Sequence, residues 1–274
     1  MGGNRTFVLL LFFRLCGRTQ NISRKFNAKP DFTFCINRGL LPAGRLAFFT
    51  LRRDTGRQIG RNRLPRMLVF WNQGLVLLAM PKTATTALLG GLRKYATAIV
   101  TQPPEIKHVP YYRYRRFLHP FYQRAGGKEM ETVAVVREPS DWLGSWYRYR
   151  HREAIAGERN STRDISFDDF VAQYLEEKPK PFARVGSQSK FLRDNDGVIG
   201  VTYLFPYEDL DDLVEFFSDR IGEVITLPVK NVSPKMNLSL DPALKKRLMA
   251  ERAEEYEVWD AARQQTLARR EATG

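Results

Sequence analysis

The sequence predicts an α/β fold in which helices cover both faces of a central parallel sheet, giving three layers. Short continuous apolar runs, which are typical of strands buried on both faces, occur at residues 75–79 (LVLLA) and 132–136 (TVAVV). Each run is followed by a polar turn and then by a segment in which apolar residues recur at helical spacing. Strands that alternate with helices in this way indicate a parallel sheet.

The helices expected after these two strands cover residues 87–98 and 142–156, and Pro139 and Asp141 are typical of the entry to the second helix. Ser166 followed by Asp169 resembles a capping box for the next helix. The remaining elements follow in chain order: a helix at 167–177, a strand at 198–205, a helix at 210–221, a short strand at 224–227 and a long charged helix at 243–267.

The positive charge of the chain is concentrated at its beginning. The formal net charge is +14, and residues 1–66 hold 14 of the 44 Lys and Arg but only two of the 30 acids. This segment has no helical or alternating period, and its apolar run at 7–13 is far shorter than the ~20 residues of a spanning helix. Residues 1–66 are therefore predicted to be a disordered basic leader or an upstream extension, and residues 67–274 the folded domain. A targeting or membrane-surface arm and a nucleic-acid-binding arm remain alternatives.

Two Cys and three His among 274 residues exclude a disulfide framework and a Cys-rich zinc module, and they leave little material for a His-based metal site. We expect no metal. Both cysteines, Cys16 and Cys35, lie in the leader, and the sequence has no complete spanning segment or signal-peptide cleavage site. We therefore expect a cytoplasmic enzyme without stable membrane insertion.

The first candidate site is the segment 81–86 (PKTATT), which lies where a strand becomes a helix. Unpaired N–H groups and the helix dipole favour an anion at such a junction, and Lys82 and three threonine hydroxyls add hydrogen-bond donors. The segment predicts a cradle for phosphate or sulfate. It is not a Walker A loop, because Lys82 precedes the hydroxyls and no glycine-rich run comes before it. A helix start without a ligand is the alternative.

The second candidate site follows the strand at 132–136. Arg137 closes this strand, and Ser145 comes eight residues later inside the next helix. Ligands of open α/β sheets bind at the carboxyl ends of the strands, so both sites are expected to face one crevice and to hold two separated anionic groups of one ligand. An ordinary salt bridge for Arg137 and a buried helical position for Ser145 are the alternatives.

These motifs resemble the sulfotransferases that use 3′-phosphoadenosine 5′-phosphosulfate (PAPS), a family with a P-loop NTPase-like architecture. The family's P-K-[ST]-G-T-T element is matched at 81–86, except that Ala84 replaces the usual Gly. Its R-x-P element with a Ser eight residues after the Arg is matched by Arg137, Pro139 and Ser145. Residues 207–210 (YEDL) and 231–233 (NVS) are similar to later family segments, and the resemblance spans about 75–259.

The resemblance implies a role for each matched residue. Lys82, Thr83, Thr85 and Thr86 would hold the 5′-phosphosulfate, and Lys82 would also neutralise charge on the leaving oxygen. Arg137 and Ser145 would bind the 3′-phosphate, and Tyr207 would lie near the adenine. The product would be 3′-phosphoadenosine 5′-phosphate (PAP), and no metal would be required. Ala84 is the departure, because its Cβ restricts φ and narrows the approach of the backbone to the phosphate.

Transfer of a sulfuryl group to a hydroxyl needs a general base. His108 is the first candidate, since related enzymes often use a His or Glu near this place in the fold. His119 and Glu105 are the other candidates, and a structural or surface role is the alternative for each.

The acceptor cannot be identified from the sequence. The stretch 111–117 (YYRYRRF) alternates aromatic and Arg side chains, which suit a carbohydrate or anionic acceptor, but a solvated amphipathic helix explains it equally well. The same two interpretations apply to Arg148, Arg150 and Arg152. We expect Trp142 and Trp146 to lie in the core. A nucleotide-dependent kinase and a basic nucleic-acid or membrane-surface binder are the alternative functions.

Overall fold

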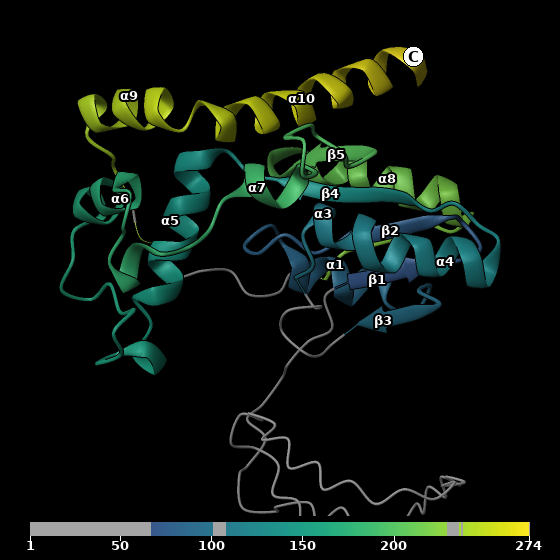
Figure 1. The fold of residues 1–274 in the computed structure, drawn as a ribbon, viewed down its shortest axis with the longest axis horizontal. Helices are drawn as coiled ribbons and strands as arrows, with labels where there is room; N and C mark the ends of the chain where they lie inside the picture. The colour runs from purple at the N-terminus through teal and green to yellow at the C-terminus, as the bar shows by residue number, and fades with distance from the viewer. Residues whose placement is uncertain (1–66, 101–107, 229–235, 237, 274) are drawn as a thin grey trace, which may run out of the picture. The chain divides into compact units, whose positions relative to one another are not determined.

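Five short strands form one mixed sheet in the part of the chain that the computed structural model describes, residues 67–100, 108–228, 236 and 238–273 (Figure 1). Strands β2, β4 and β5 are parallel, as predicted, whereas β1 is antiparallel to both of its neighbours. The prediction of a wholly parallel sheet is therefore wrong at one side. The strands in spatial order are β3 (Ala98–Val100), β1 (Met67–Phe70), β2 (Leu75–Leu78), β4 (Glu131–Val136) and β5 (Tyr203–Pro206).

A tight turn explains the antiparallel side of the sheet. Residues 71–74 join β1 to β2, and Gly74 takes a φ of +69° and donates its N–H to the Trp71 carbonyl (3.1 Å). Glycine adopts this left-handed conformation at little cost. The chain reverses here, so Phe70 lies opposite Leu75. Sequence analysis identified β2 but did not separate the four-residue strand before it.

The predicted bounds are confirmed at both ends of α8 and at the start of α6. The ends predicted at 98 and 156 are wrong, because α1 ends at Leu92 and α5 at Arg150, and Ala98 belongs to β3. The Ser166 hydroxyl accepts the Asp169 N–H (3.0 Å), which confirms the capping interaction. In chain order the helices are α1 (Thr85–Leu92), α3 (Tyr111–Arg113), α4 (His119–Gly126), α5 (Pro139–Arg150), α6 (Phe167–Leu175), α7 (Gln188–Leu192), α8 (Leu210–Ile221), α9 (Pro242–Glu251) and α10 (Ala253–Thr273), with a π-helical turn at Tyr114–Leu118.

Three predicted elements are corrected. The strand predicted at 198–205 is confined to Tyr203–Pro206, because Ile199 instead forms an isolated bridge with Arg193. The strand at 224–227 is not formed, and this segment packs against α1. The long C-terminal helix divides into α9 and α10 at Arg252, whose guanidinium donates to the carbonyls of Tyr174 and Leu175 at the end of α6.

Alternate residues of the strands enter two separate cores, so the sheet is the middle of three layers. On one face, the β2 residues Val76 and Leu78 pack with α7 and α10. On the other face, Leu75 and Leu77 pack with the leucines of α1 and with Phe217 of α8. A third cluster joins α5, α6 and α9 beside the sheet. The mixed α/β fold and its helical layers thus follow from the period of two along each buried strand.

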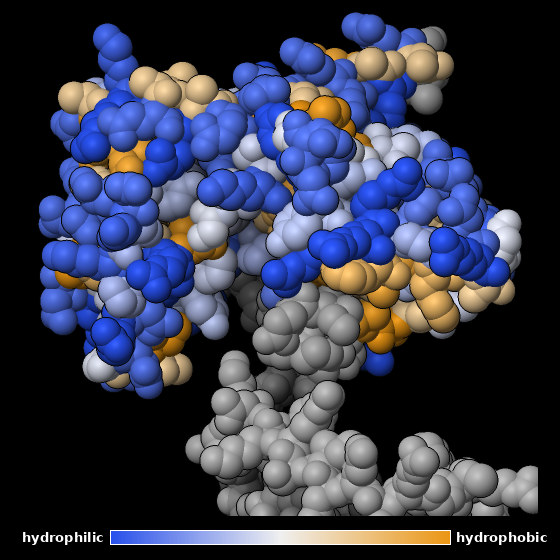
Figure 2. All heavy atoms as spheres, in the orientation of Figure 1, coloured by the Kyte–Doolittle hydropathy of each residue, from blue (hydrophilic) through white to orange (hydrophobic). Residues whose placement is uncertain are grey.

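Hydrophilic side chains cover most of the face drawn in Figure 2, and hydrophobic atoms show between them in small groups. Phe117 and Phe121 are among the large apolar side chains that are exposed. Within the described residues, no helix combines the length and the apolar character needed to cross a membrane.

Gly90 and Gly91 interrupt α1 for a packing reason. A Cβ on Gly91 would lie 2.8 Å from both the Thr226 carbonyl oxygen and Leu227 Cδ2, and a Cβ on Gly90 would lie 2.4 Å from Pro228. The paired glycines therefore let the segment after α8 approach α1 more closely than any other residue would allow.

We expect Gly91→Ala to lower the free energy of unfolding by up to about 2 kcal/mol, because an overpacking cost of about 1–3 kcal/mol outweighs the ~1 kcal/mol that Ala gains in helix propensity. Urea denaturation followed by circular dichroism measures this. The control is Gly144→Ala in α5, where the nearest atom, Leu238 Cδ1, would lie 3.3 Å from the new Cβ. That variant should be unchanged or up to about 1 kcal/mol more stable. Equal effects at the two positions would contradict the packing argument.

Candidate active site

The carboxyl ends of β2, β4 and β5 lie at one edge of the sheet, because these three neighbouring strands are parallel. A predicted site residue follows each strand. Lys82 lies in the turn after β2, Arg137 comes directly after β4, and Tyr207 comes directly after β5. The structure therefore brings residues from three distant parts of the sequence to the same edge.

The turn between β2 and α1 is held in an unusual backbone conformation. Lys82 has a φ of +71° and Ala84 a φ of +54°, and among the described residues these are the only non-glycine residues with positive φ. Left-handed backbone costs about 1–2 kcal/mol for a residue with a Cβ. The Thr83 side chain is buried and donates to the Met80 carbonyl (2.9 Å), so its hydroxyl stabilises the turn itself. Strain of this kind is concentrated at functional sites.

The N-terminus of α1 has no side-chain cap. Its N-cap residue is Ala84, which has no oxygen to accept a hydrogen bond. Side chains cap α5, α6, α7 and α9, whereas α3, α4 and α8 resemble α1 in having no side-chain cap. Thr85 and Thr86 form the first positions of α1, where backbone N–H groups lack intrahelical partners. The positive end of the α1 dipole is thus available to an anion.

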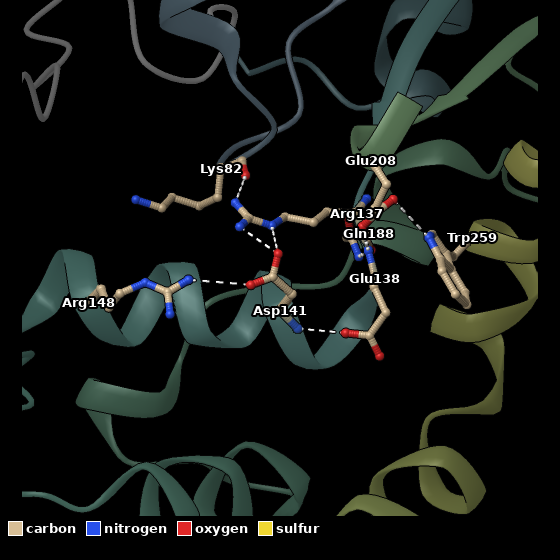
Figure 3. A network of polar contacts seen from close by, with 8 residues as sticks. All are labelled: Lys82, Arg137, Glu138, Asp141, Arg148, Gln188, Glu208 and Trp259. Atoms are coloured by element: carbon tan, nitrogen blue, oxygen red, sulfur yellow. Dashed lines mark hydrogen bonds and ion pairs between the residues drawn. The ribbon is translucent and has the colours of Figure 1, made fainter. Parts of the chain in front are cut away.

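Two hydrogen bonds attach this turn to the neighbouring strand-to-helix junction. The Trp142 indole N–H donates to the Pro81 carbonyl (2.9 Å). Arg137 Nη1 donates to the Lys82 carbonyl (3.3 Å), as Figure 3 shows. Trp142 belongs to α5 and is buried, as expected. The Lys82 turn and the Arg137 side chain therefore lie side by side, and they do not open onto opposite surfaces.

The Arg137 guanidinium is oriented from three directions. Its Nε and Nη2 donate to Asp141 Oδ2 at 2.6 and 2.5 Å, and its face lies 4.0 Å from the ring centre of Tyr207. Asp141 also pairs with Arg148, at 3.3 Å between Nη2 and Oδ1. Asp141 is more exposed than Arg137, at 45% against 11% of the side chain. An anionic ligand would bind the Arg137 guanidinium beside Asp141, or it would displace the Asp141 carboxylate from the guanidinium.

Figure 3 shows the Lys82 side chain extending away from Arg137. Its ammonium lies on aromatic rings of α5. Its Nζ is 4.2 Å from the ring centre of Tyr149 and 5.5 Å from that of Trp146. Ser145 is buried, and it shares a helix face with Tyr149 four residues later. The structure therefore directs the Lys82 ammonium toward the side of α5 that carries Ser145. No hydrogen bond between Ser145 and Arg137 is found among the described residues.

The three candidate bases have different surroundings. His108 is half-buried, and its Nδ1 lies 2.8 Å from the carbonyl oxygen of Ala79, three residues before Lys82. If Nδ1 donates this hydrogen bond, the lone pair of the neutral ring is at Nε2. His119 is buried against Tyr114, lies near Arg115 and is 3.5 Å from Glu129, which indicates a structural role. Glu105 lies outside the described residues, as do residues 1–66 and 231–233.

Several cationic and aromatic side chains make contacts that stabilise the fold. Arg150 is buried and donates to the carbonyls of Pro181, Phe182 and Arg184 (3.1, 2.5 and 2.8 Å), and burial lowers its pKa. In the stretch 111–117, Tyr114 is buried in the core and burial raises its pKa, whereas the arginines are exposed. This arrangement agrees with the amphipathic-helix interpretation of the stretch.

Comparisons with protein-family models, with curated proteins and with solved structures find no match for this chain. Over the described residues, no cluster of three or more His, Cys, Asp or Glu side chains has the arrangement needed to hold a metal ion. The site is therefore interpreted from its own geometry.

Sequence reasoning missed the residues that support Arg137. Asp141 was noted only as a helix-entry residue, although its i,i+4 spacing from Arg137 could have indicated an ion pair. Gln188 binds both backbone groups of Arg137, and Glu208 accepts the Glu138 N–H. Gln188 carries no sequence signal, because its partner is 51 positions away. Glu208 belongs to the segment 207–210, but nothing in that segment indicates a bond to Glu138, 70 positions away.

We expect Ala84→Gly to raise the free energy of unfolding by about 0.5–1 kcal/mol, because Gly removes the left-handed strain but loses more chain entropy on folding. Ala87→Gly, in the right-handed first turns of α1, is the matched control and should lose about 1 kcal/mol. Thermal and urea unfolding of both variants measure the difference. Destabilisation of the same size in both would show that the turn at Ala84 is unstrained.

Proposed function

We propose that this chain is a sulfotransferase, which transfers a sulfuryl group from PAPS to an acceptor hydroxyl and releases PAP. The observation that carries the proposal is the direct contact of the Lys82 turn with the Arg137 side chain at one edge of the sheet. This contact gives one ligand two adjacent anion-binding positions on two neighbouring parallel strands. Ordinary adenine nucleotides lack the 3′-phosphate that would use the second position.

The uncapped N-terminus of α1 suits the 5′-phosphosulfate end of the donor. Backbone N–H groups of Thr85 and Thr86 and the helix dipole would bind its oxygens, and the Lys82 ammonium would move from the Tyr149 ring to the bridging oxygen. The contact of an ammonium with an aromatic face contributes about 0.5–2 kcal/mol, which is less than a charge-assisted bond to a doubly charged anion can contribute. Ala84 narrows the cradle relative to a glycine but permits the left-handed turn that the cradle needs.

The Arg137 guanidinium suits the 3′-phosphate. It is already oriented by Tyr207 and Asp141, so little side-chain entropy is lost when a phosphate binds. Ser145 lies on the α5 face that the Lys82 ammonium approaches, and its hydroxyl would supply a second donor to the ligand. Tyr207 stacks on the guanidinium and therefore lies beside the position of the adenosine.

The donor supplies an activated sulfuryl group whose S–O bond breaks as the acceptor oxygen attacks sulfur. Lys82 neutralises the charge that develops on the departing phosphate oxygen. His108 accepts the acceptor's hydroxyl proton at Nε2, while Nδ1 keeps its hydrogen bond to the Ala79 carbonyl. The products are a sulfate ester, PAP and a proton. The step uses only residues near the end of β2.

The acceptor is proposed to be a carbohydrate, or an anionic molecule that carries a hydroxyl. Tyr149 is 38% exposed beside Lys82, and Arg152 lies 5.1 Å from its ring centre. An aromatic face next to guanidinium groups can stack on a sugar ring and bind a carboxylate or sulfate. A cytoplasmic location remains part of the proposal.

Calorimetric titration of the chain with PAP and with ATP in the presence of Mg²⁺ tests the donor. PAP should bind with a Kd at least about tenfold lower than that of ATP, since the 3′-phosphate adds charge-assisted hydrogen bonds. Tighter binding of Mg²⁺–ATP would favour the kinase alternative instead.

Substitution of the two main cations should affect different steps. Lys82→Ala should lower kcat by about 10²–10³ with a smaller change in PAP affinity, because Lys82 acts mainly on the leaving oxygen. Arg137→Ala should raise the Kd for PAP by about 10–100-fold through lost charge-assisted hydrogen bonds. Lys94→Ala, at an exposed position after α1, is the control. Unchanged turnover and affinity in both site variants would falsify the mechanism.

Asp141→Asn should raise PAP affinity by about threefold to tenfold at low salt, because the carboxylate competes with a phosphate for Arg137 and repels it. The variant should also unfold about 0.3–1 kcal/mol more easily, because it removes an acid from the first turn of α5. Asp211→Asn, an exposed acid in the first turn of α8, is the control. Weaker PAP binding in Asp141→Asn would show that the carboxylate orients Arg137 more than it competes for it.

A further inference from the structure

Gln188 fixes the backbone of Arg137 at the point where β4 has ended. Its side chain is fully buried, its Oε1 accepts the Arg137 N–H (3.0 Å), and its Nε2 donates to the Arg137 carbonyl (2.8 Å). One amide thus binds both polar groups of a residue that lies beyond the strand pairing, which ends at Val136. The Gln188 side chain therefore gives Arg137 the pair of backbone hydrogen bonds that a neighbouring strand would otherwise provide.

Gln188 is in turn held by Glu255 of α10. Glu255 Oε2 accepts the N–H groups of Gln188 (2.9 Å) and Ser189 (3.3 Å), and only 2% of Glu255 is exposed. Burial raises the pKa of the Glu255 carboxyl, and hydrogen bonds from Ser187, Ser189 and Gln188 act against this rise. Burying a carboxylate is costly unless it is hydrogen-bonded, so these contacts hold it in one position.

A second chain of contacts from α10 reaches the next residue, Glu138. The Trp259 indole N–H donates to Glu208 Oε2 (3.2 Å), and Glu208 Oε1 accepts the Glu138 N–H (3.0 Å) (Figure 3). Glu208 follows Tyr207, the ring of which lies against the Arg137 guanidinium. This second chain therefore acts on Arg137 both through the adjacent peptide and through its aromatic neighbour.

The two chains of contacts begin on one face of α10, because Glu255 and Trp259 are four residues apart. They end on the consecutive residues Arg137 and Glu138. We propose that α10 positions Arg137 for the 3′-phosphate of the donor through the pairs Glu255–Gln188 and Trp259–Glu208. This inference rests on the proposed function and assigns positioning roles to four residues that do not touch the ligand.

The expected consequence is specific to one ligand group. A guanidinium at the end of a long side chain reaches a phosphate correctly only if its backbone and its stacking ring are both fixed, and small displacements weaken oriented contacts sharply. Loosening either chain of contacts should therefore weaken recognition of the 3′-phosphate and leave binding of the 5′-phosphate at α1 unaffected.

PAP and AMP provide the test, because they differ only in the 3′-phosphate. The quantity to measure is the ratio of their dissociation constants, by calorimetry on the full chain. In Trp259→Phe, which keeps the ring but loses the N–H donor, the preference for PAP should fall about threefold to tenfold, as expected for loss of one hydrogen bond. Gln188→Leu should reduce it at least as much. AMP affinity should change less than twofold in either variant.

Gln265→Leu is the matched control. Gln265 also lies on α10, and its Oε1 accepts the N–H of the buried strand residue Leu204 (2.8 Å). Among the residues that the structure describes, no hydrogen bond joins Gln265 to Arg137 or to Gln188. This variant should lower the melting temperature without changing the ratio of the dissociation constants. If Gln188→Leu does not fold, Trp259→Phe alone decides the test.

An unchanged preference in Trp259→Phe and Gln188→Leu would overturn the positioning role and leave the proposed function intact. Equal loss of PAP and AMP affinity would also overturn it, since that result indicates general loosening of the fold. If the wild-type chain does not prefer PAP over AMP, the proposed function itself is wrong.

Discussion

The hydrogen bond from Arg137 to the Lys82 carbonyl is the contact on which the candidate site depends. Together with the bond from Trp142 to the Pro81 carbonyl, it fastens the turn after β2 to the junction after β4. Neither contact uses the Lys82 side chain, so both hold the turn through its backbone carbonyls. A turn that is fixed by its carbonyls does not use its N–H donors for that purpose.

This attachment also explains how the turn tolerates two left-handed residues. Lys82 and Ala84 together cost about 2–4 kcal/mol of backbone strain, which is a sizeable part of the stability of an ordinary domain. Such strain persists only when surrounding contacts over-determine the conformation. The buried Thr83 hydroxyl, the Trp142 indole and the Arg137 guanidinium supply three such contacts within four residues of the chain. A glycine at position 84 would carry less backbone strain and would need fewer supporting contacts. The three contacts therefore compensate for the strain that Ala84 adds.

The sequence predicts the parts of this fold that have a local cause. The apolar runs of β2 and β4, the capping box at Ser166 and the period of α8 depend on neighbouring residues, and the structure agrees with them. The antiparallel β1 was missed because a four-residue strand is buried on both faces and has no period of its own. The split between α9 and α10 was missed because its cause, the contact of Arg252 with the end of α6, joins residues 77 and 78 positions apart.

The same distinction applies to the site. Lys82 and Arg137 could be selected from the sequence because they lie after the ends of two predicted strands, whereas Tyr207 was indicated by the resemblance of residues 207–210. The residues that orient Arg137 lie on α7, on α10 and beyond β5, and they act through backbone groups that have no sequence signature. The residues proposed to bind the ligand can therefore be found near the strand ends in the sequence. The residues that position Arg137 lie mainly in the helical layer that covers the sheet. A guanidinium that is paired, stacked and fixed at its backbone before any ligand arrives has already lost most of its conformational freedom. Under the proposed function, the affinity of this edge for an anion would depend on the support from α10 as well as on the cations around it.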